Sequence, residues 1–153
     1  MASSANVHGT GLVLGSTGVL LRGPSGSGKS ILALGLIDRW EGRGQQALLV
    51  ADDRVDIERR GNELVMRAPA TIAGMIELSG RGIVQRPHVN EAPLHLVVDL
   101  EPDFIRMPEE IALTTTLFGV AIARAPVPQA GLAALGHQVL LVAEAIAELP
   151  RAV

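Results

Sequence analysis

A glycine-rich octet carries the most chemically informative residues of this sequence. Residues 23–30 read GPSGSGKS and match the pattern G-x-x-x-x-G-K-[S/T], in which backbone N–H groups wrap around phosphate oxygens. The octet contains the only lysine of the chain, Lys29, among 13 lysine and arginine residues. We expect Lys29 to reach the β- and γ-phosphates of a nucleotide and the hydroxyl of Ser30 to bind Mg²⁺. The phosphates themselves are expected to contact Gly23, Pro24, Ser25, Gly26, Ser27, Gly28, Lys29 and Ser30.

Two adjacent carboxylates follow the next apolar run. The segment ALLVA at 47–51 is typical of a buried strand, and Asp52 and Asp53 come directly after it. In a phosphate-loop domain the next strand normally lies beside the loop, so we expect both acids to face the terminal phosphate. One carboxylate can support the metal, and the other can accept the proton of an attacking hydroxyl. A solvated pair of acids at a strand end is the alternative interpretation.

Two other classes of nucleotide-binding protein fit the sequence poorly. No N-K-x-D sequence is present, which disfavours a guanine-specific GTPase. The segments LSGRG at 78–82 and LVVDLEP at 96–102 superficially match the signature and Walker B motifs of an ABC-transporter ATPase. In that class a glutamate directly follows the aspartate, whereas here Leu100 follows Asp99.

The elements that must position these residues indicate a mixed α/β sheet with few helices. Apolar residues recur at helical spacing over 29–40, which begins inside the octet, and again over 132–149, where Pro150 ends the pattern. We expect strands on both sides of a turn at 15–18, over 47–51, 94–100 and 117–127, and a β-hairpin over 54–67. Many strands with two helices favour a mixed sheet over a regular doubly wound one.

Length and composition indicate one globular domain over residues 1–153. A net charge of −3 argues against binding to nucleic acid or to an anionic membrane surface, and the absence of cysteine excludes disulfides and thiolate chemistry. The sequence shows neither a secretory signal nor an apolar run of the roughly 18 residues that span a membrane. We therefore expect a cytoplasmic protein.

Four ordered segments resemble the catalytic domain of the HPr kinase/phosphorylase family. They are VHG at 7–9, GVLLRGPSGSGKS at 18–30, LLVADDRVDI at 48–57 and MIELSGRGIV at 75–84. The resemblance implies a phosphate-loop fold similar to that of phosphoenolpyruvate carboxykinase, in the short form found in some proteobacteria without a separate N-terminal domain. It also implies assembly into a homo-oligomer, which is a hexamer in known family members.

The resemblance further implies a reaction. Family members use ATP and Mg²⁺ to phosphorylate a serine of HPr, a small carrier of the sugar phosphotransferase system, and many reverse the reaction with inorganic phosphate. Carried over by position, Asp53 is the general base, His8 lies near the reacting groups, and Lys29 neutralises phosphate charge. Ser30 and Glu77 are the magnesium ligands that the resemblance implies, and Arg106 is expected to stabilise the transferred charge. Asp52, as the other acid of the pair, is a further expected magnesium ligand.

Three of these residues have an alternative interpretation. His8 can be a solvated residue of an N-terminal tail, Glu77 an exposed strand position, and Arg106 a surface partner of Asp103 or Glu109. The segment APVPQAGLAAL at 125–135 lacks the arginines that phosphorylase-active relatives carry there, so efficient phosphorolysis is not expected. An ATP-binding sensor or assembly factor and a small-molecule kinase are the alternative functions.

Overall fold

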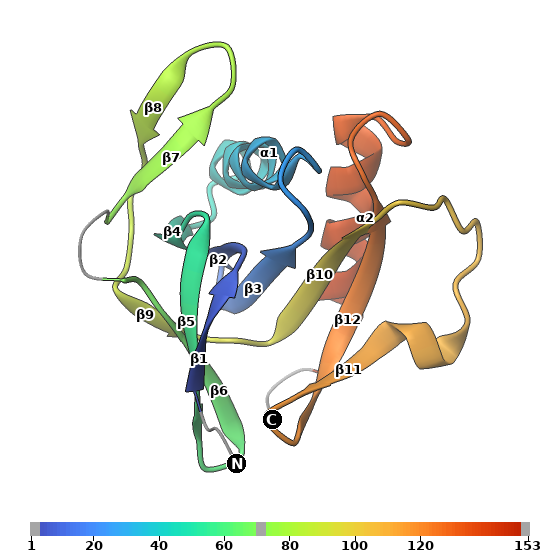
Figure 1. Ribbon diagram of the computed structural model, residues 1–153. Helices are drawn as coiled ribbons and strands as arrows, with labels where there is room; N and C mark the ends of the chain where they lie inside the picture. The colour runs from blue at the N-terminus through green and yellow to red at the C-terminus, as the bar shows by residue number, and fades with distance from the viewer. Residues whose placement is uncertain (1–3, 70–72, 151–153) are drawn as a thin grey trace.

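The computed structural model describes residues 4–69 and 73–150, and it contains a six-stranded mixed sheet at its centre (Figure 1). The strand order is β11-β12-β10-β3-β2-β4. Strands β3, β10 and β12 run parallel to one another, and the remaining pairs are antiparallel. The six strands are β2 (Thr10–Leu14), β3 (Thr17–Arg22), β4 (Ala47–Ala51), β10 (Leu96–Glu101), β11 (Thr114–Leu117) and β12 (Val120–Pro128).

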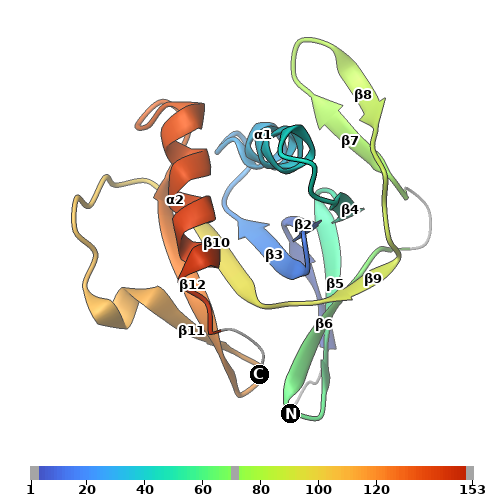
Figure 2. The same ribbon diagram turned by 180° about the vertical axis from the view of Figure 1, so that it is seen from behind.

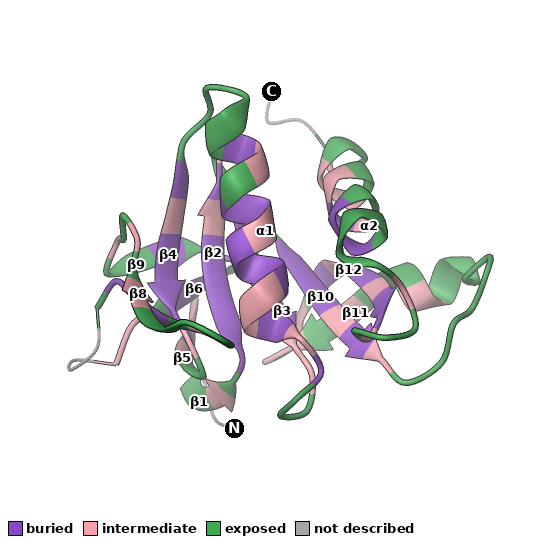
Figure 3. Ribbon diagram, turned by 90° about the horizontal axis from the view of Figure 1, so that it is seen from above, coloured by how far each residue is buried: buried purple, intermediate pink, exposed green. Residues whose placement is uncertain are grey.

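Alternation along the strands gives this sheet two buried faces. On one face, Val19, Leu21 and Val98 pack with residues of helices α1 (Lys29–Gly42) and α2 (Leu135–Ala147). On the other face, Leu20 and Val97 belong to a second core. Viewed from above, the buried side of α1 points toward the sheet, and α2 lies beside α1 on the same face (Figure 3).

The second core is closed by a four-stranded antiparallel sheet in the order β1-β5-β6-β9. Its strands are β1 (Ser4–His8), β5 (Arg54–Arg60), β6 (Glu63–Arg67) and β9 (Glu91–Pro93). The molecule therefore has three layers, namely helices, the six-stranded sheet and the four-stranded sheet. A short 3₁₀ helix, η1 (Glu110–Leu113), lies between β10 and β11.

One hairpin stands apart from these layers. Strands β7 (Met75–Leu78) and β8 (Gly82–Gln85) pair only with each other and project beside α1 (Figures 1 and 2). Ile76 points inward and is fully buried in the helix-side core. Because side chains alternate along a strand, Glu77 lies on the opposite, exposed face of the hairpin.

The mixed sheet with two helices that the sequence predicts is confirmed, as are the strands on both sides of the 15–18 turn and the hairpin around Gly61. Both predicted helices are present, with α2 beginning later, at Leu135, than the apolar pattern suggested. Strands β1, β9 and β11 were not predicted from the sequence. None of their sequences, SANVH, EAP and TTTL, contains an apolar run, and the one that alternates, SANVH, has only two apolar residues to distinguish it from a loop.

Candidate active site

The phosphate loop connects the end of β3 to the start of α1, as its sequence predicts. Arg22 ends the strand and Lys29 begins the helix. Gly26 and Gly28 have φ angles of 82° and 96°, in a region that favours glycine, so the octet can follow a path that other residues resist. The positive end of α1 and the N–H groups of its first turn lie at the end of this loop.

The side chain of Lys29 folds back onto the start of the phosphate loop. Its Nζ donates hydrogen bonds to the carbonyl oxygens of Gly23, at 2.7 Å, and Pro24, at 3.1 Å. Burial lowers the pKa of Lys29 below its usual value, against the opposing effect of the negative charges of Asp53 and Asp52. The ammonium group is therefore partly desolvated and close to both acids, an arrangement suited to binding a multiply charged anion.

Two further features describe the interior and the packing of the loop. The hydroxyl of Ser27 is buried without a hydrogen-bond partner among the described residues, so it is an unused polar atom inside the loop. A Cβ atom added at Gly28 would lie 2.9 Å from Cβ of Ala130, whose N–H donates to the carbonyl of Ser27. The segment after β12 thus packs against the loop and holds its shape.

Asp52 links the phosphate loop to β2. Its Oδ1 accepts hydrogen bonds from the hydroxyl of Ser30, at 3.1 Å, and from the hydroxyl of Thr10, at 2.8 Å. Thr10 is fully buried, so this second bond is shielded from water. The carboxylate and the Ser30 hydroxyl together present the oxygen ligands that Mg²⁺ prefers.

The carboxylate of Asp53 contacts a different residue, His8. Its Oδ1 lies 3.0 Å from Nε2 of His8, and its side chain is 75% exposed. Asp53 adopts a φ angle of 70°, uncommon for a residue other than glycine, and its carbonyl accepts a hydrogen bond from the N–H of Gly9. This backbone conformation sends the neighbouring acids to separate partners, Asp52 to Ser30 and Asp53 to His8.

The alternative interpretation of His8 as a tail residue is wrong. His8 ends strand β1 and pairs with Arg54 in the first register position of β5. This pairing places the imidazole next to the turn that carries Asp52 and Asp53. The structure therefore brings together five of the predicted site residues: His8, Lys29, Ser30, Asp52 and Asp53.

Glu77 and Arg106 are not joined to this group. Glu77 lies on the exposed face of the β7–β8 hairpin, and Arg106 lies in the exposed segment between β10 and η1. Within residues 4–69 and 73–150 neither side chain forms a hydrogen bond or an ion pair, so the surface pairing of Arg106 with Asp103 or Glu109 is absent there. In the same described part of the chain, no group of three or more His, Asp or Glu side chains is arranged to hold a metal by itself.

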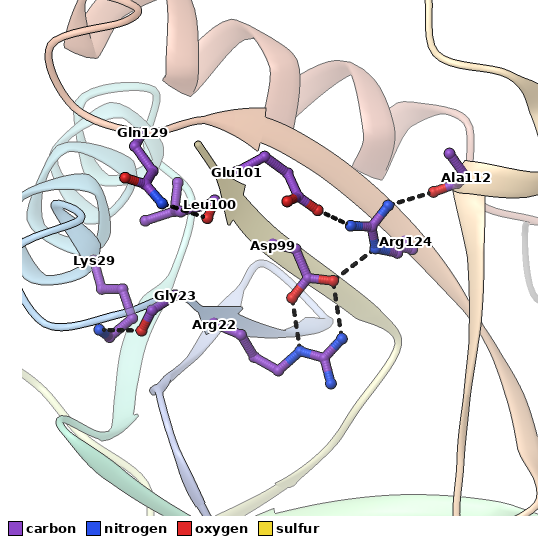
Figure 4. A network of polar contacts seen from close by, with 9 residues as sticks. All are labelled: Arg22, Gly23, Lys29, Asp99, Leu100, Glu101, Ala112, Arg124 and Gln129. Atoms are coloured by element: carbon purple, nitrogen blue, oxygen red, sulfur yellow. Dashed lines mark hydrogen bonds and ion pairs between the residues drawn. The ribbon is translucent and has the colours of Figure 1, made fainter. Parts of the chain in front are cut away.

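A network of charges fixes the strand that leads into the phosphate loop (Figure 4). The carboxylate of Asp99 accepts two hydrogen bonds from Arg22, at 2.7 and 2.9 Å, and one from Arg124, at 2.6 Å. Burial alone would raise the pKa of Asp99, but the hydrogen bonds and charges of the two arginines outweigh it and hold that pKa below its usual value. Asp99 is thus committed to the arginines, which agrees with its rejection as a Walker B residue.

Arg124 extends this network to the segment that follows β10. Its guanidinium also donates to Glu101 and to the carbonyl of Ala112 in η1. Close by, the side-chain amide of Gln129 donates to the carbonyl of Leu100 (Figure 4). The backbone N–H of Gln129 donates to the carbonyl of Glu101. Neither Thr10 nor Arg124 was identified from the sequence, because only strand register brings each of them to its acidic partner.

Comparisons with known proteins agree with this geometry. The family model described as HPr Serine kinase C-terminal domain matches residues 1–101. An HPr kinase/phosphorylase of Clostridium acetobutylicum is 37% identical over 108 residues, which cover 66% of this chain and 34% of that protein. An HPr kinase/phosphorylase of Burkholderia cenocepacia is 36% identical over 136 residues, which cover 81% of this chain and 40% of that protein.

A solved structure, that of the HPr(Ser) kinase/phosphatase from Coxiella burnetii, superposes with a TM-score of 0.73 at 27% identity, covering 94% of this chain and 92% of that one. The alignments with the two curated relatives cover only 34% and 40% of those proteins. Among the described residues, no helix is both long enough and apolar enough to cross a membrane. The matched family model spans most of the chain and all of its phosphate loop and acidic pair, and on that basis the chain belongs to the HPr serine kinase C-terminal domain family.

Proposed function

We propose that this protein is a Mg-ATP-dependent kinase that phosphorylates a serine of HPr or of an HPr-like carrier. The observation that carries the proposal is the position of Asp53. Its carboxylate is exposed and hydrogen-bonded to His8, and it lies close enough to Lys29 to influence the pKa of that lysine. A carboxylate that is both accessible and adjacent to a phosphate loop can serve as the base toward an incoming hydroxyl.

ATP fits the phosphate loop. Backbone N–H groups of Gly23 and of residues 25–28, the unpartnered hydroxyl of Ser27 and the ammonium group of Lys29 would surround its phosphates. Ser30 and Asp52 would hold the magnesium ion, with Glu77 as a further ligand contributed by the β7–β8 hairpin. Magnesium supplies positive charge that offsets the charge of the phosphates and orients them.

The proposed reaction is a direct transfer. The serine oxygen of the carrier attacks the γ-phosphorus of ATP, the bond from that phosphorus to the β,γ-bridging oxygen breaks, and ADP leaves. The serine proton passes to the carboxylate of Asp53, which His8 holds in place. Lys29 stabilises charge on the phosphates, and Arg106 would assist only by movement of the segment that carries it.

The reverse reaction is proposed to be weak. The segment after β12 contacts the phosphate loop through Ala130, so it is well placed to contact a second phosphate. Residues 129–135 read QAGLAAL and offer no cationic side chain for that purpose. We further propose a single catalytic domain over 1–153 that works in the cytoplasm as a homo-oligomer, without nucleic acid or membrane partners.

Transfer of label tests this function. The protein is incubated with γ-labelled ATP, MgCl₂ and purified HPr, and the products are separated into protein and small molecules. We expect label on a serine of HPr and none on HPr whose acceptor serine is replaced by alanine. Label in a soluble metabolite would instead indicate a small-molecule kinase, and ATP binding without any transfer would indicate a sensor or assembly factor.

A further inference from the structure

A groove lies along β10 and β12, and β10 pairs with β3, the strand that leads into the phosphate loop. The segment from Glu101 to Ala112 leaves the sheet at the end of β10 and returns over it, anchored by the bond from Arg124 to the carbonyl of Ala112. The groove has a volume of about 450 Å³. Its walls combine three prolines with apolar side chains from the returning segment, chiefly Ile105, Met107 and Ile111.

Two properties of this groove are unusual for a surface left in water. Met107 and Ile111 are 82% and 81% exposed, and Ile105 is exposed beside them. Three carboxylates also line the groove, and only that of Glu101 is neutralised, by Arg124. Asp103 and Glu109 form no hydrogen bond or ion pair with any described residue. The groove is therefore apolar along its length and negatively charged at its rim.

The groove lies on the same face of the central sheet as the candidate base. Leu96, Val98 and Leu100 of β10 point to the helices, so Asp99 and Glu101, at alternate positions, point to the other face. The four-stranded sheet covers that other face, and its strand β1 carries His8, the partner of Asp53. Both features also flank the end of β3, where the phosphate loop begins.

We propose that this groove is the docking surface for the protein acceptor, which seats there a surface patch of arginine or lysine surrounded by apolar side chains. The inference rests on the proposed kinase function, because it assigns a place to the substrate of that reaction. A cationic group on the acceptor would meet Asp103 and Glu109, and its apolar neighbours would cover Met107 and Ile111.

A second copy of this chain fits the groove less well. A two-fold contact through the same patch would place Asp103 and Glu109 against their own equivalents, and like charges brought together oppose association. The face of the β7–β8 hairpin that carries exposed Ile83 also carries Glu77, so it too would bring a carboxylate to the acidic rim. The unpaired charges of the groove therefore favour a basic partner.

Binding measurements with matched variants test the docking surface. The variants are Asp103→Arg, which reverses one rim charge, and Met107→Ser, which removes an exposed apolar side chain. The control is Glu41→Arg, the same type of charge reversal at an exposed position of helix α1, which covers the other face of the sheet. Calorimetry measures the affinity of each protein for HPr and, separately, for Mg-ATP, and sedimentation velocity measures the oligomeric state.

We expect Asp103→Arg and Met107→Ser each to weaken HPr binding about tenfold, with the affinity for Mg-ATP and the oligomeric state unchanged. Wild-type binding of HPr should also weaken as salt is raised. The inference would be overturned if Asp103→Arg and Met107→Ser bound HPr as tightly as the control Glu41→Arg. It would also be overturned if these variants changed the oligomeric state but not HPr binding, or if wild type did not bind HPr. If wild type binds HPr through the groove but transfers no phosphate, the docking surface stands and the kinase proposal fails.

Discussion

His8 and Asp53 are 45 positions apart in the chain, and Nε2 of the imidazole lies 3.0 Å from Oδ1 of the carboxylate. Strand β1 makes this contact possible, because its pairing with β5 brings His8 back to the turn after β4. A carboxylate can only accept hydrogen bonds, so the imidazole N–H is the donor. The contact holds in place an exposed side chain that would otherwise sample several rotamers.

Replacing His8 by alanine should therefore slow phosphate transfer without impairing nucleotide binding. We expect kcat to fall about tenfold to a hundredfold, less than the loss that removal of a base itself produces. His8→Gln, whose amide can still donate, should recover part of the rate. Steady-state kinetics with HPr, together with calorimetric ATP affinity, measure both effects. A full rate in His8→Ala would show that the contact has no role in transfer.

Removal of the Thr10 hydroxyl should weaken magnesium-dependent binding. Thr10→Val is nearly isosteric and takes from Asp52 a buried donor at 2.8 Å, leaving Ser30 as the remaining donor to Oδ1. We expect the Mg²⁺ concentration for half-maximal ATP binding to rise about tenfold, the size of one hydrogen bond to a charged group. Thr10→Ser keeps the hydroxyl and should behave like wild type. Equal loss of ATP affinity with and without Mg²⁺ would point to damage to the loop instead.

Two glycines of the phosphate loop should respond differently to alanine. Both have positive φ angles, but a Cβ at Gly26 meets nothing within 4 Å, whereas one at Gly28 lies 2.9 Å from Cβ of Ala130. Gly26→Ala should lower ATP affinity severalfold through backbone strain of about 1–2 kcal/mol. Gly28→Ala adds the collision and should lower affinity by a further factor of ten or more. Fluorescent-nucleotide titration compares them, and equal affinities would contradict the contact with Ala130.

Asp99 should stabilise the fold in a pH-dependent way. Its pKa is lower in the folded protein than in the unfolded chain, so its contribution is full above the usual value and is lost as the pH falls through the lower folded value. Asp99→Asn leaves Arg22 and Arg124 without their shared charged partner. We expect the free energy of unfolding to fall by about 2–4 kcal/mol at pH 7.

Denaturant unfolding at several pH values measures this loss. The difference in free energy of unfolding between wild type and Asp99→Asn should become smaller as the pH falls below 3.8, the usual pKa of aspartate. Glu91→Gln is the control, because Glu91 pairs with Arg60 on the exposed side of the four-stranded sheet and should barely shift the midpoint. A difference in free energy of unfolding that does not change with pH would mean that packing, not charge, explains the effect of Asp99→Asn.

The sequence predicted the parts of the site that are contiguous in the chain. The octet at 23–30 and the acids after 47–51 are local patterns with a known geometry, and the structure places them side by side. The contacts that depend on strand register could not be predicted from the sequence. Thr10 meets Asp52 only because β2 pairs with β4, and Arg124 meets Asp99 only because β10 lies between β3 and β12.

The most direct test of the central claim is single-turnover transfer from γ-labelled Mg-ATP to HPr by wild type and by Asp53→Asn. The substitution keeps the size of the side chain and removes its ability to accept the serine proton. The account predicts transfer by wild type, a rate at least a hundredfold lower for Asp53→Asn, and the same Mg-ATP affinity for both proteins. Equal transfer rates for the two proteins would contradict the role of Asp53 as the base.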